Sequence, residues 1–143
     1  KHTVINFFIN RAFAGEPLTV YEPGPQARNF VHVMDVARVY VRSTERLLKQ
    51  LDRNETGTET YEIAGEEDMS IMNVAEIVSS AAEETLGTEI DIELVTNPRS
   101  AETMVEEFGV DTSQTREVLD WIPTESVESS VQRLLSGRWY SIS

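Results

Sequence analysis

Residues 20–41 read VYEPGPQARNFVHVMDVARVYV, and this stretch sets most of our expectations for the fold. Its tip holds two prolines and a glycine, which predict a rigid turn. The apolar residues before the tip predict a strand over residues 18–21, and those after it predict a second strand over residues 30–33. Asp35 then follows as the predicted N-cap of a long helix that continues to about Leu51.

The rest of the chain alternates helical and strand patterns in the same way, which indicates an α/β or α+β fold. We expect further helices from Thr3 to Gly15, from Ser70 to Gly87, from Asp111 or Thr112 to Leu119 and from Ser126 through Leu135, and further strands over residues 60–64 and 90–94. Two helices carry apolar faces that are long for so small a protein. These faces comprise Ile5, Phe8, Ile9, Ala12 and Phe13 in the first helix, and Val36, Val39, Tyr40 and Leu47 in the helix after Asp35.

Acidic residues dominate the charged composition. The 143 residues include 25 acids and 12 bases, which gives a formal net charge of −13. Nucleic acids and anionic membranes are therefore poor partners. Lys1 and Lys49 are the only lysines. Scarce lysine with excess acid is typical of a surface adapted to high salt, where self-repulsion is screened; an ordinary acidic cytosolic protein is the alternative.

The chain has no cysteine, which excludes disulfides and thiolate chemistry. No apolar run approaches the roughly 18 residues of a membrane span. No signal peptide is visible, so we expect a cytoplasmic protein. The first residue is Lys1 instead of Met, from which we expect a piece of a longer protein.

No complete active-site motif is present. The seven glycines are spaced too widely for a dinucleotide-binding loop or a P-loop. His2 and His32 are the only histidines, which disfavours a transition-metal site. No tyrosine is followed four residues later by lysine, and no serine lies in a G-x-S-x-G motif. We therefore predict binding chemistry rather than a self-sufficient active site.

Two arginines are candidates for such binding. Arg28 and Arg99 lie outside the predicted helices, after prolines and next to predicted strands. A guanidinium suits phosphate because it is planar, always charged and able to bond through two donors at once. The alternative is that each arginine pairs with a surface carboxylate, and spacing alone favours that alternative.

Three longer stretches carry a resemblance to a known family. GEPLTVYEPGPQARNFVHVMDVARVYV resembles the "GEPLTVYGDGxQxRDFxHVxDVAxA" region of the extended short-chain dehydrogenases, which include the NAD-dependent nucleotide-sugar epimerases and dehydratases. TYEIAGEEDMSIMNVAEIV is similar to the family's "YNIGxGxxxSvxevA", and NPRSAETMVEEFGVDTSQTREVLDWIPTESVESSVQRLL is similar to its "RpGDxxxxxxDxSKAxxxLGWxPxxsLeeGl" ending. The motifs keep the family's order and span nearly the whole chain.

The resemblance implies that residues 1–143 are the C-terminal, substrate-binding part of a Rossmann-type enzyme. The family's NAD-binding loop and its Tyr-x-x-x-Lys would precede Lys1, in a domain absent from this chain. The implied intact enzyme is a nucleotide-sugar 4-epimerase of the UDP-glucose 4-epimerase type, with a 4,6-dehydratase, a decarboxylase or a non-catalytic regulatory module as alternatives. Family dimers use helices that would also precede Lys1, so a homodimer is implied for the intact enzyme only.

The resemblance also assigns substrate contacts by position. Arg28 and Arg99 match the two arginines that hold the diphosphate of the nucleotide sugar. Thr19 and Tyr21 match residues on the strand that lies against the base. Ile71 matches an apolar residue near the nucleotide.

Other positions depart from the family pattern. Glu102 stands where the family usually has the Asp that contacts the ribose, and it follows Ala101 instead of Gly. Asn29 replaces the Asp that follows the first arginine.

Overall fold

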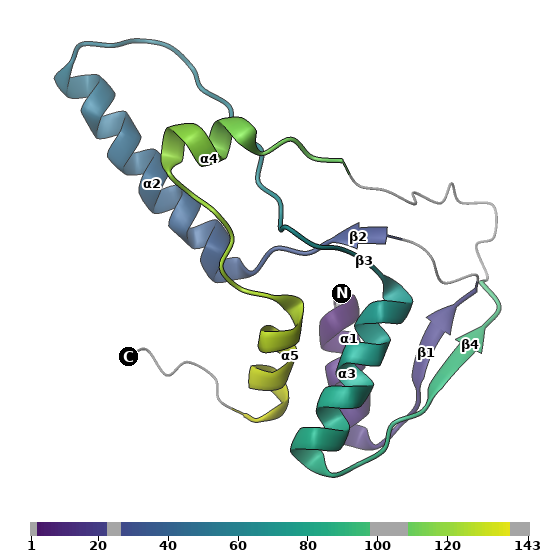
Figure 1. The fold of residues 1–143 in the computed structure, drawn as a ribbon. Helices are drawn as coiled ribbons and strands as arrows, with labels where there is room; N and C mark the ends of the chain where they lie inside the picture. The colour runs from purple at the N-terminus through teal and green to yellow at the C-terminus, as the bar shows by residue number, and fades with distance from the viewer. Residues whose placement is uncertain (1–2, 23–26, 98–108, 138–143) are drawn as a thin grey trace. The chain divides into compact units, whose positions relative to one another are not determined.

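The computed structural model describes residues 3–22, 27–97 and 109–137 (Figure 1). They form a mixed α/β protein, which confirms the predicted class. The chain divides into two compact units: unit 1 comprises Lys1–Arg28, Asp68–Phe108 and Ser126–Ser143, and unit 2 comprises Asn29–Glu67 and Gly109–Glu125. No helix within the described ranges is long and apolar enough to cross a membrane.

Unit 1 packs three helices with a pair of parallel strands. The helices are α1 (Val4–Ala14), α3 (Ile71–Leu86) and α5 (Val127–Leu135), and the strands are β1 (Leu18–Tyr21) and β4 (Ile92–Val95). Helix α3 contacts α1, α5 and both strands, as Figure 1 shows. Its Val74 and Val78 are completely buried, and burying each such side chain stabilises the unit by roughly 1.5–3 kcal/mol.

The register of β1 decides which of its side chains remain exposed. Leu18 pairs with Ile92, and Tyr21 pairs with Val95. Successive side chains of a strand point to opposite faces. Leu18 and Val20 are completely buried, whereas Tyr21 is 52% exposed. One face of β1 therefore belongs to the core of unit 1, and the other is open.

The ends of the unit 1 helices follow the sequence signals. Thr3 and Ser70 are the N-caps of α1 and α3, and the Ser70 hydroxyl accepts a hydrogen bond from the Asn73 amide at 3.0 Å. Gly15 and Gly87 end these helices in the left-handed conformation that favours glycine, with φ of 67° and 66°. The predicted starts and stops of α1 and α3 are confirmed.

The predicted apolar face of α1 is only partly confirmed. Phe8, Ile9 and Ala12 are buried, but Phe13 is 53% exposed. Phe13 lies about 40° beyond Ile9 around the helix and about 100° from Ala12, which places it at the edge of the buried stripe.

Two strand predictions are wrong. Residues 30–33 contain no strand; instead β2 (Ala27–Asn29) lies just before them and neighbours β3 (Asp68–Ser70). The chain leaves the strand because His32 is the N-cap of the next helix, where its Nδ1 accepts from the Met34 amide at 3.1 Å. Residues 60–64 are also outside any strand, since no described strand pairs with them.

Unit 2 is built around the long helix α2 (Val33–Asp52) and the short helix α4 (Ser113–Leu119). Its core cluster contains Val39, Leu119 and Trp121, against which Tyr61 and Ile63 pack. This is a small core for a helix of 20 residues.

Much of the apolar surface of α2 is left uncovered by the described residues. Of the residues predicted to share one apolar side of this helix, Val39 is buried, whereas Tyr40 is 71% and Leu47 is 55% exposed. The stripe that they belong to, called here the outer stripe, consists of Val33, Met34, Tyr40, Val41, Leu47, Leu48 and Leu51, all exposed. The core of unit 2 covers the opposite side of α2.

Asp35 is not the N-cap that the sequence suggested. His32 takes that position, and Asp35 lies in the first turn of α2 with no exposed surface. Its carboxylate accepts hydrogen bonds from the Thr124 amide and hydroxyl (3.2 and 3.1 Å) and from the Glu125 amide (3.1 Å), and it pairs with Arg38. Asp35 therefore fastens the segment before α5 to the start of α2.

The environment of Asp35 keeps it ionised. Burial by itself raises the pKa of this carboxyl, but the hydrogen bonds from Glu125, Arg38 and Thr124 outweigh burial and hold the pKa below its ordinary value. The folded state therefore favours the carboxylate, and Asp35 contributes stability at neutral pH.

We predict that Asp35→Asn lowers the free energy of unfolding at pH 7 by about 2 kcal/mol, because an amide loses the charge-assisted bonds. Urea denaturation measures this change. Asp35 has a lowered pKa in the folded state, so its contribution is present above the unfolded pKa of about 4 and is lost as the pH falls below it. The difference between wild type and variant should therefore shrink below about pH 4. Asp52→Asn, at the exposed end of α2, is the control, and equal losses in both variants would contradict the assignment.

Candidate functional site

The open face of β1 carries two of the residues assigned to the nucleotide. Thr19 is half-buried and Tyr21 is exposed, and both side chains lie on the face opposite Leu18 and Val20. The parallel partner strand places Glu93 beside Thr19. The face thus offers a hydroxyl and an aromatic ring next to an acidic residue.

Arg28 lies on β2 with its side chain exposed. Its guanidinium donates to the carbonyl of the preceding Ala27 at 3.0 Å. Among the described residues, no carboxylate lies within ion-pair distance of Arg28. The surface ion pair that the sequence favoured is therefore not seen in the part of the chain that is described.

The other arginines behave differently. Six of them form ion pairs with carboxylates: Arg11 with Glu16, Arg38 with Asp35, Arg42 with Glu45, Arg46 with Glu59, Arg53 with Glu55, and Arg116 with Glu66. An acid-rich surface supplies such partners readily. An exposed guanidinium without a carboxylate at ion-pair distance is thus unusual among the described arginines.

The remaining assigned residues divide between described and undescribed parts of the chain. Ile71 is half-buried at the first position of α3, directly after β3, which neighbours the strand of Arg28. Ile71, Arg28, Thr19 and Tyr21 all belong to unit 1. Arg99 and Glu102 lie outside the described residues.

The structure adds one contact that the sequence did not predict. The side-chain amide of Asn29 accepts from the Gly65 N–H at 2.7 Å and donates to the Gly65 carbonyl at 3.0 Å. We call this pair of bonds the Asn29–Gly65 clasp. The only sequence signal was the replacement of Asp by Asn directly after Arg28, which by itself names no partner.

Unit 2 contains another polar cluster, whereas the described residues assigned to the ligand belong to unit 1. Arg46 on α2 binds both carboxylate oxygens of Glu59 (3.1 and 2.8 Å), and the Tyr61 hydroxyl donates to the same carboxylate. These bonds, that of Arg46 first, lower the pKa of Glu59 to about 2. Because all the strong donors and acceptors are already satisfied by one another, the cluster fastens residues 59–61 to α2 rather than forming a reactive site.

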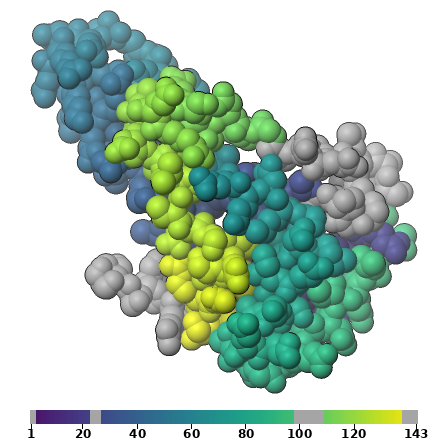
Figure 2. Space-filling model, viewed as in Figure 1, coloured from purple at the N-terminus to yellow at the C-terminus, as the bar shows by residue number. Residues whose placement is uncertain are grey.

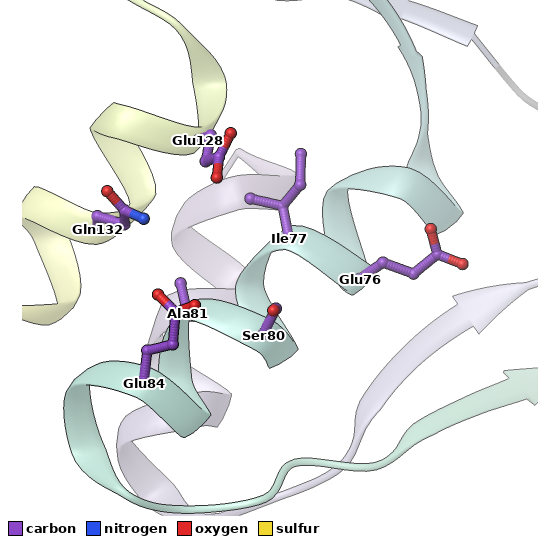
Figure 3. A pocket seen from close by; sticks show the side chains of 7 residues that line it. All are labelled: Glu76, Ile77, Ser80, Ala81, Glu84, Glu128 and Gln132. Carbon is purple, nitrogen blue, oxygen red and sulfur yellow. The ribbon is translucent and has the colours of Figure 1, made fainter.

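A hollow of about 290 Å³ lies between α3 and α5, and Figure 3 shows the side chains that line it. The atoms of the two helices are in contact in the space-filling view of Figure 2. Ile77 and Ala81 contribute apolar surface to it, and Glu76, Glu84 and Glu128 line it with carboxylates. Such a lining repels a diphosphate. None of the assigned residues lines it, so it is not the candidate site.

Metal ions and dinucleotides are each held by characteristic groups of residues. No group of three histidines, aspartates or glutamates within the described ranges is arranged to hold a metal ion. The close glycines that hold the phosphates of NAD against a helix start are missing from the whole sequence.

Comparisons with known proteins give a consistent picture. Residues 1–64 match the family model described as the NAD dependent epimerase/dehydratase family. The chain is 28% identical over 143 residues to dTDP-glucose 4,6-dehydratase of Neisseria gonorrhoeae, covering 96% of this chain and 38% of the relative. It is 32% identical over 124 residues to UDP-glucuronic acid decarboxylase 3 of Arabidopsis thaliana, covering 84% of this chain and 30% of the relative.

Solved structures support the fold. UDP-glucose 4-epimerase of Thermotoga maritima, solved with UDP-glucose, superimposes with a TM-score of 0.70 at 20% identity, over 95% of this chain and 39% of that one. The chain thus spans well under half the length of the relatives it matches. Residues 1–64 thus match the NAD-dependent epimerase/dehydratase family, and the fold of the chain is that of the solved epimerase.

Proposed function

We propose that this chain is the C-terminal, nucleotide-sugar-binding part of an NAD-dependent nucleotide-sugar 4-epimerase. The observation that carries the proposal is the state of Arg28, which is exposed on β2 without a carboxylate partner among the described residues, while six other arginines are paired. A diphosphate supplies the oxygens that a free guanidinium binds most strongly.

The other assigned residues fit the remaining parts of such a ligand. In the proposed complex, Tyr21 and Thr19 on the open face of β1 contact the base, and Ile71 provides apolar surface beside the nucleotide. Arg99 serves as the second diphosphate ligand, and Glu102 contacts the ribose. Binding energy from the diphosphate and base, remote from the reacting carbon, orients the sugar.

The chain's part in the reaction is binding alone. It has neither a dinucleotide loop nor a Tyr-x-x-x-Lys, so we assign no step of hydride or proton transfer to its residues. In the intact enzyme a preceding domain would hold NAD, which would supply the hydride-transfer chemistry. The chain by itself is expected to be inactive.

The choice of a 4-epimerase within the family is the expectation drawn from the sequence resemblance. Two of the sequence relatives carry the names of a dehydratase and a decarboxylase. These are the alternative reactions for the intact protein.

The outer stripe of α2 supports the idea that a further domain packs on this chain. Seven large apolar side chains along a 20-residue helix are exposed. Monomeric proteins rarely expose a contiguous apolar surface of this kind. We propose that the NAD-binding domain of the intact protein covers the stripe.

The coding sequence upstream of Lys1 gives the first test. The proposal expects a glycine-rich loop after a first strand, followed by Tyr-x-x-x-Lys. A loop without the Tyr-Lys pair would indicate a nucleotide-sugar-binding protein that does not catalyse. Absence of both would remove the enzyme proposal.

We predict that Arg28→Ala weakens binding of UDP to the full-length gene product by about tenfold to a hundredfold, because a charge-assisted pair is lost. Uridine, which has no phosphate, should bind equally well to both proteins. Isothermal titration calorimetry measures both affinities. Arg42→Ala removes an arginine that is exposed but paired with Glu45, and it should bind UDP like wild type. Unchanged UDP affinity in Arg28→Ala would remove Arg28 from the site.

A third prediction concerns the outer stripe. The double substitution Val41→Ser and Leu48→Ser should leave the unfolding midpoint of the isolated 143-residue chain nearly unchanged, since both side chains are exposed there. In the full-length gene product the same change should lower stability by about 2–4 kcal/mol if another domain buries the stripe. Chemical denaturation of both proteins makes the comparison, and equal effects in the two would contradict domain packing on α2.

A further inference from the structure

The Asn29–Gly65 clasp uses both hydrogen-bonding groups of one peptide unit. Asn29 Oδ1 accepts from the Gly65 N–H, and Asn29 Nδ2 donates to the Gly65 carbonyl. A neighbouring β-strand would satisfy a residue in the same way. The side chain of Asn29 therefore replaces a strand partner at the end of β2, where regular pairing stops.

Gly65 is required for this approach. A Cβ atom built on Gly65 would lie 1.7 Å from the Phe30 carbonyl oxygen, which is backbone and cannot move aside locally. No other residue type fits at position 65 without separating the two segments. The clasp thus depends on a matched pair, an amide side chain at position 29 and a glycine at position 65.

The clasp has a direct consequence for Arg28, the residue that precedes Asn29 in β2. Side chains alternate along a strand, and β2 follows this rule: Ala27 is buried, Arg28 is exposed and Asn29 is half-buried. Holding the Asn29 side chain against Gly65 fixes the rotation of the strand about its own axis. With that rotation fixed, the side chain of Arg28 leaves the strand on the face opposite to that of Asn29, toward solvent.

We propose that Asn29 is a positioning residue for Arg28: by clasping Gly65 it holds the end of β2 so that the guanidinium is presented to the ligand's diphosphate. The inference rests on the proposed function of Arg28. Only an amide both donates and accepts in this geometry. A carboxylate at position 29 would keep the bond from the Gly65 N–H and lose the bond to its carbonyl.

A double-mutant cycle tests the coupling on the full-length gene product, with UDP and uridine as probes. Asn29→Ala should weaken UDP binding by about tenfold and leave uridine binding unchanged. In the Arg28→Ala background, Asn29→Ala should cause no further loss of UDP affinity, because the group that it positions is gone. Asn29→Asp, which keeps one bond of the clasp, should show a smaller loss that also disappears in that background. Asn10→Ala, on an exposed part of α1, is the matched control and should bind like wild type.

The outcomes separate this inference from the proposal on which it rests. If wild type does not bind UDP, or Arg28→Ala binds it equally well, the proposed function fails. If Arg28→Ala weakens UDP binding but Asn29→Ala and Asn29→Asp do not, the function stands and positioning is wrong. Losses that affect uridine equally, or that persist at full size without Arg28, would show that Asn29 acts only on stability and would also overturn positioning. If Asn29→Ala does not fold, the Asn29→Asp cycle decides alone.

Discussion

The buried carboxylate of Asp35 holds together segments of unit 2 that lie far apart in the sequence. It is charged and has no exposed surface, which would be costly without its ring of donors. Thr124 and Glu125 supply backbone N–H groups, and Arg38 supplies the opposite charge. The Trp121 indole donates to the Asp35 carbonyl at 2.9 Å, so the core aromatic is anchored at the same turn of α2. The small core of unit 2 depends on this arrangement because little apolar surface is buried around it.

The described arginines of this acidic protein fall into two groups, those that pair with a carboxylate and those for which no such pair is seen. Most described arginines are used internally, in pairs such as Arg46 with Glu59 that fasten loops to helices. Arg28 differs because no described carboxylate lies within ion-pair distance of it. A protein of net charge −13 repels anions in general, so an anionic ligand needs a positive side chain that no nearby carboxylate neutralises. In our proposal the Asn29–Gly65 clasp keeps Arg28 in its exposed orientation, since it fixes the short strand that carries Arg28.

Local signals in the sequence predicted the helices well and the strands less well. Thr3, Ser70 and the glycines at positions 15 and 87 mark helix ends through their own backbone and side-chain chemistry, so they need no distant partner. Residues 60–64 alternate like a strand, but a strand also requires a neighbour, which none of the described strands provides. Periodicity predicted that α2 has an apolar side, but periodicity does not show what covers that side.

The sequence by itself determined the mixed α/β class, the ends of α1 and α3 and the family resemblance, and it named Arg28 as the candidate ligand to phosphate, because each rests on local chemistry or on motif order. Only the tertiary structure decided that Arg28 has no described carboxylate partner, that Asp35 is a buried acceptor and that Asn29 clasps Gly65. These contacts join residues 36 to 90 positions apart, as the Asn29–Gly65 and Asp35–Glu125 bonds show. Such pairings depend on how the chain folds back on itself, and residue type alone does not specify them.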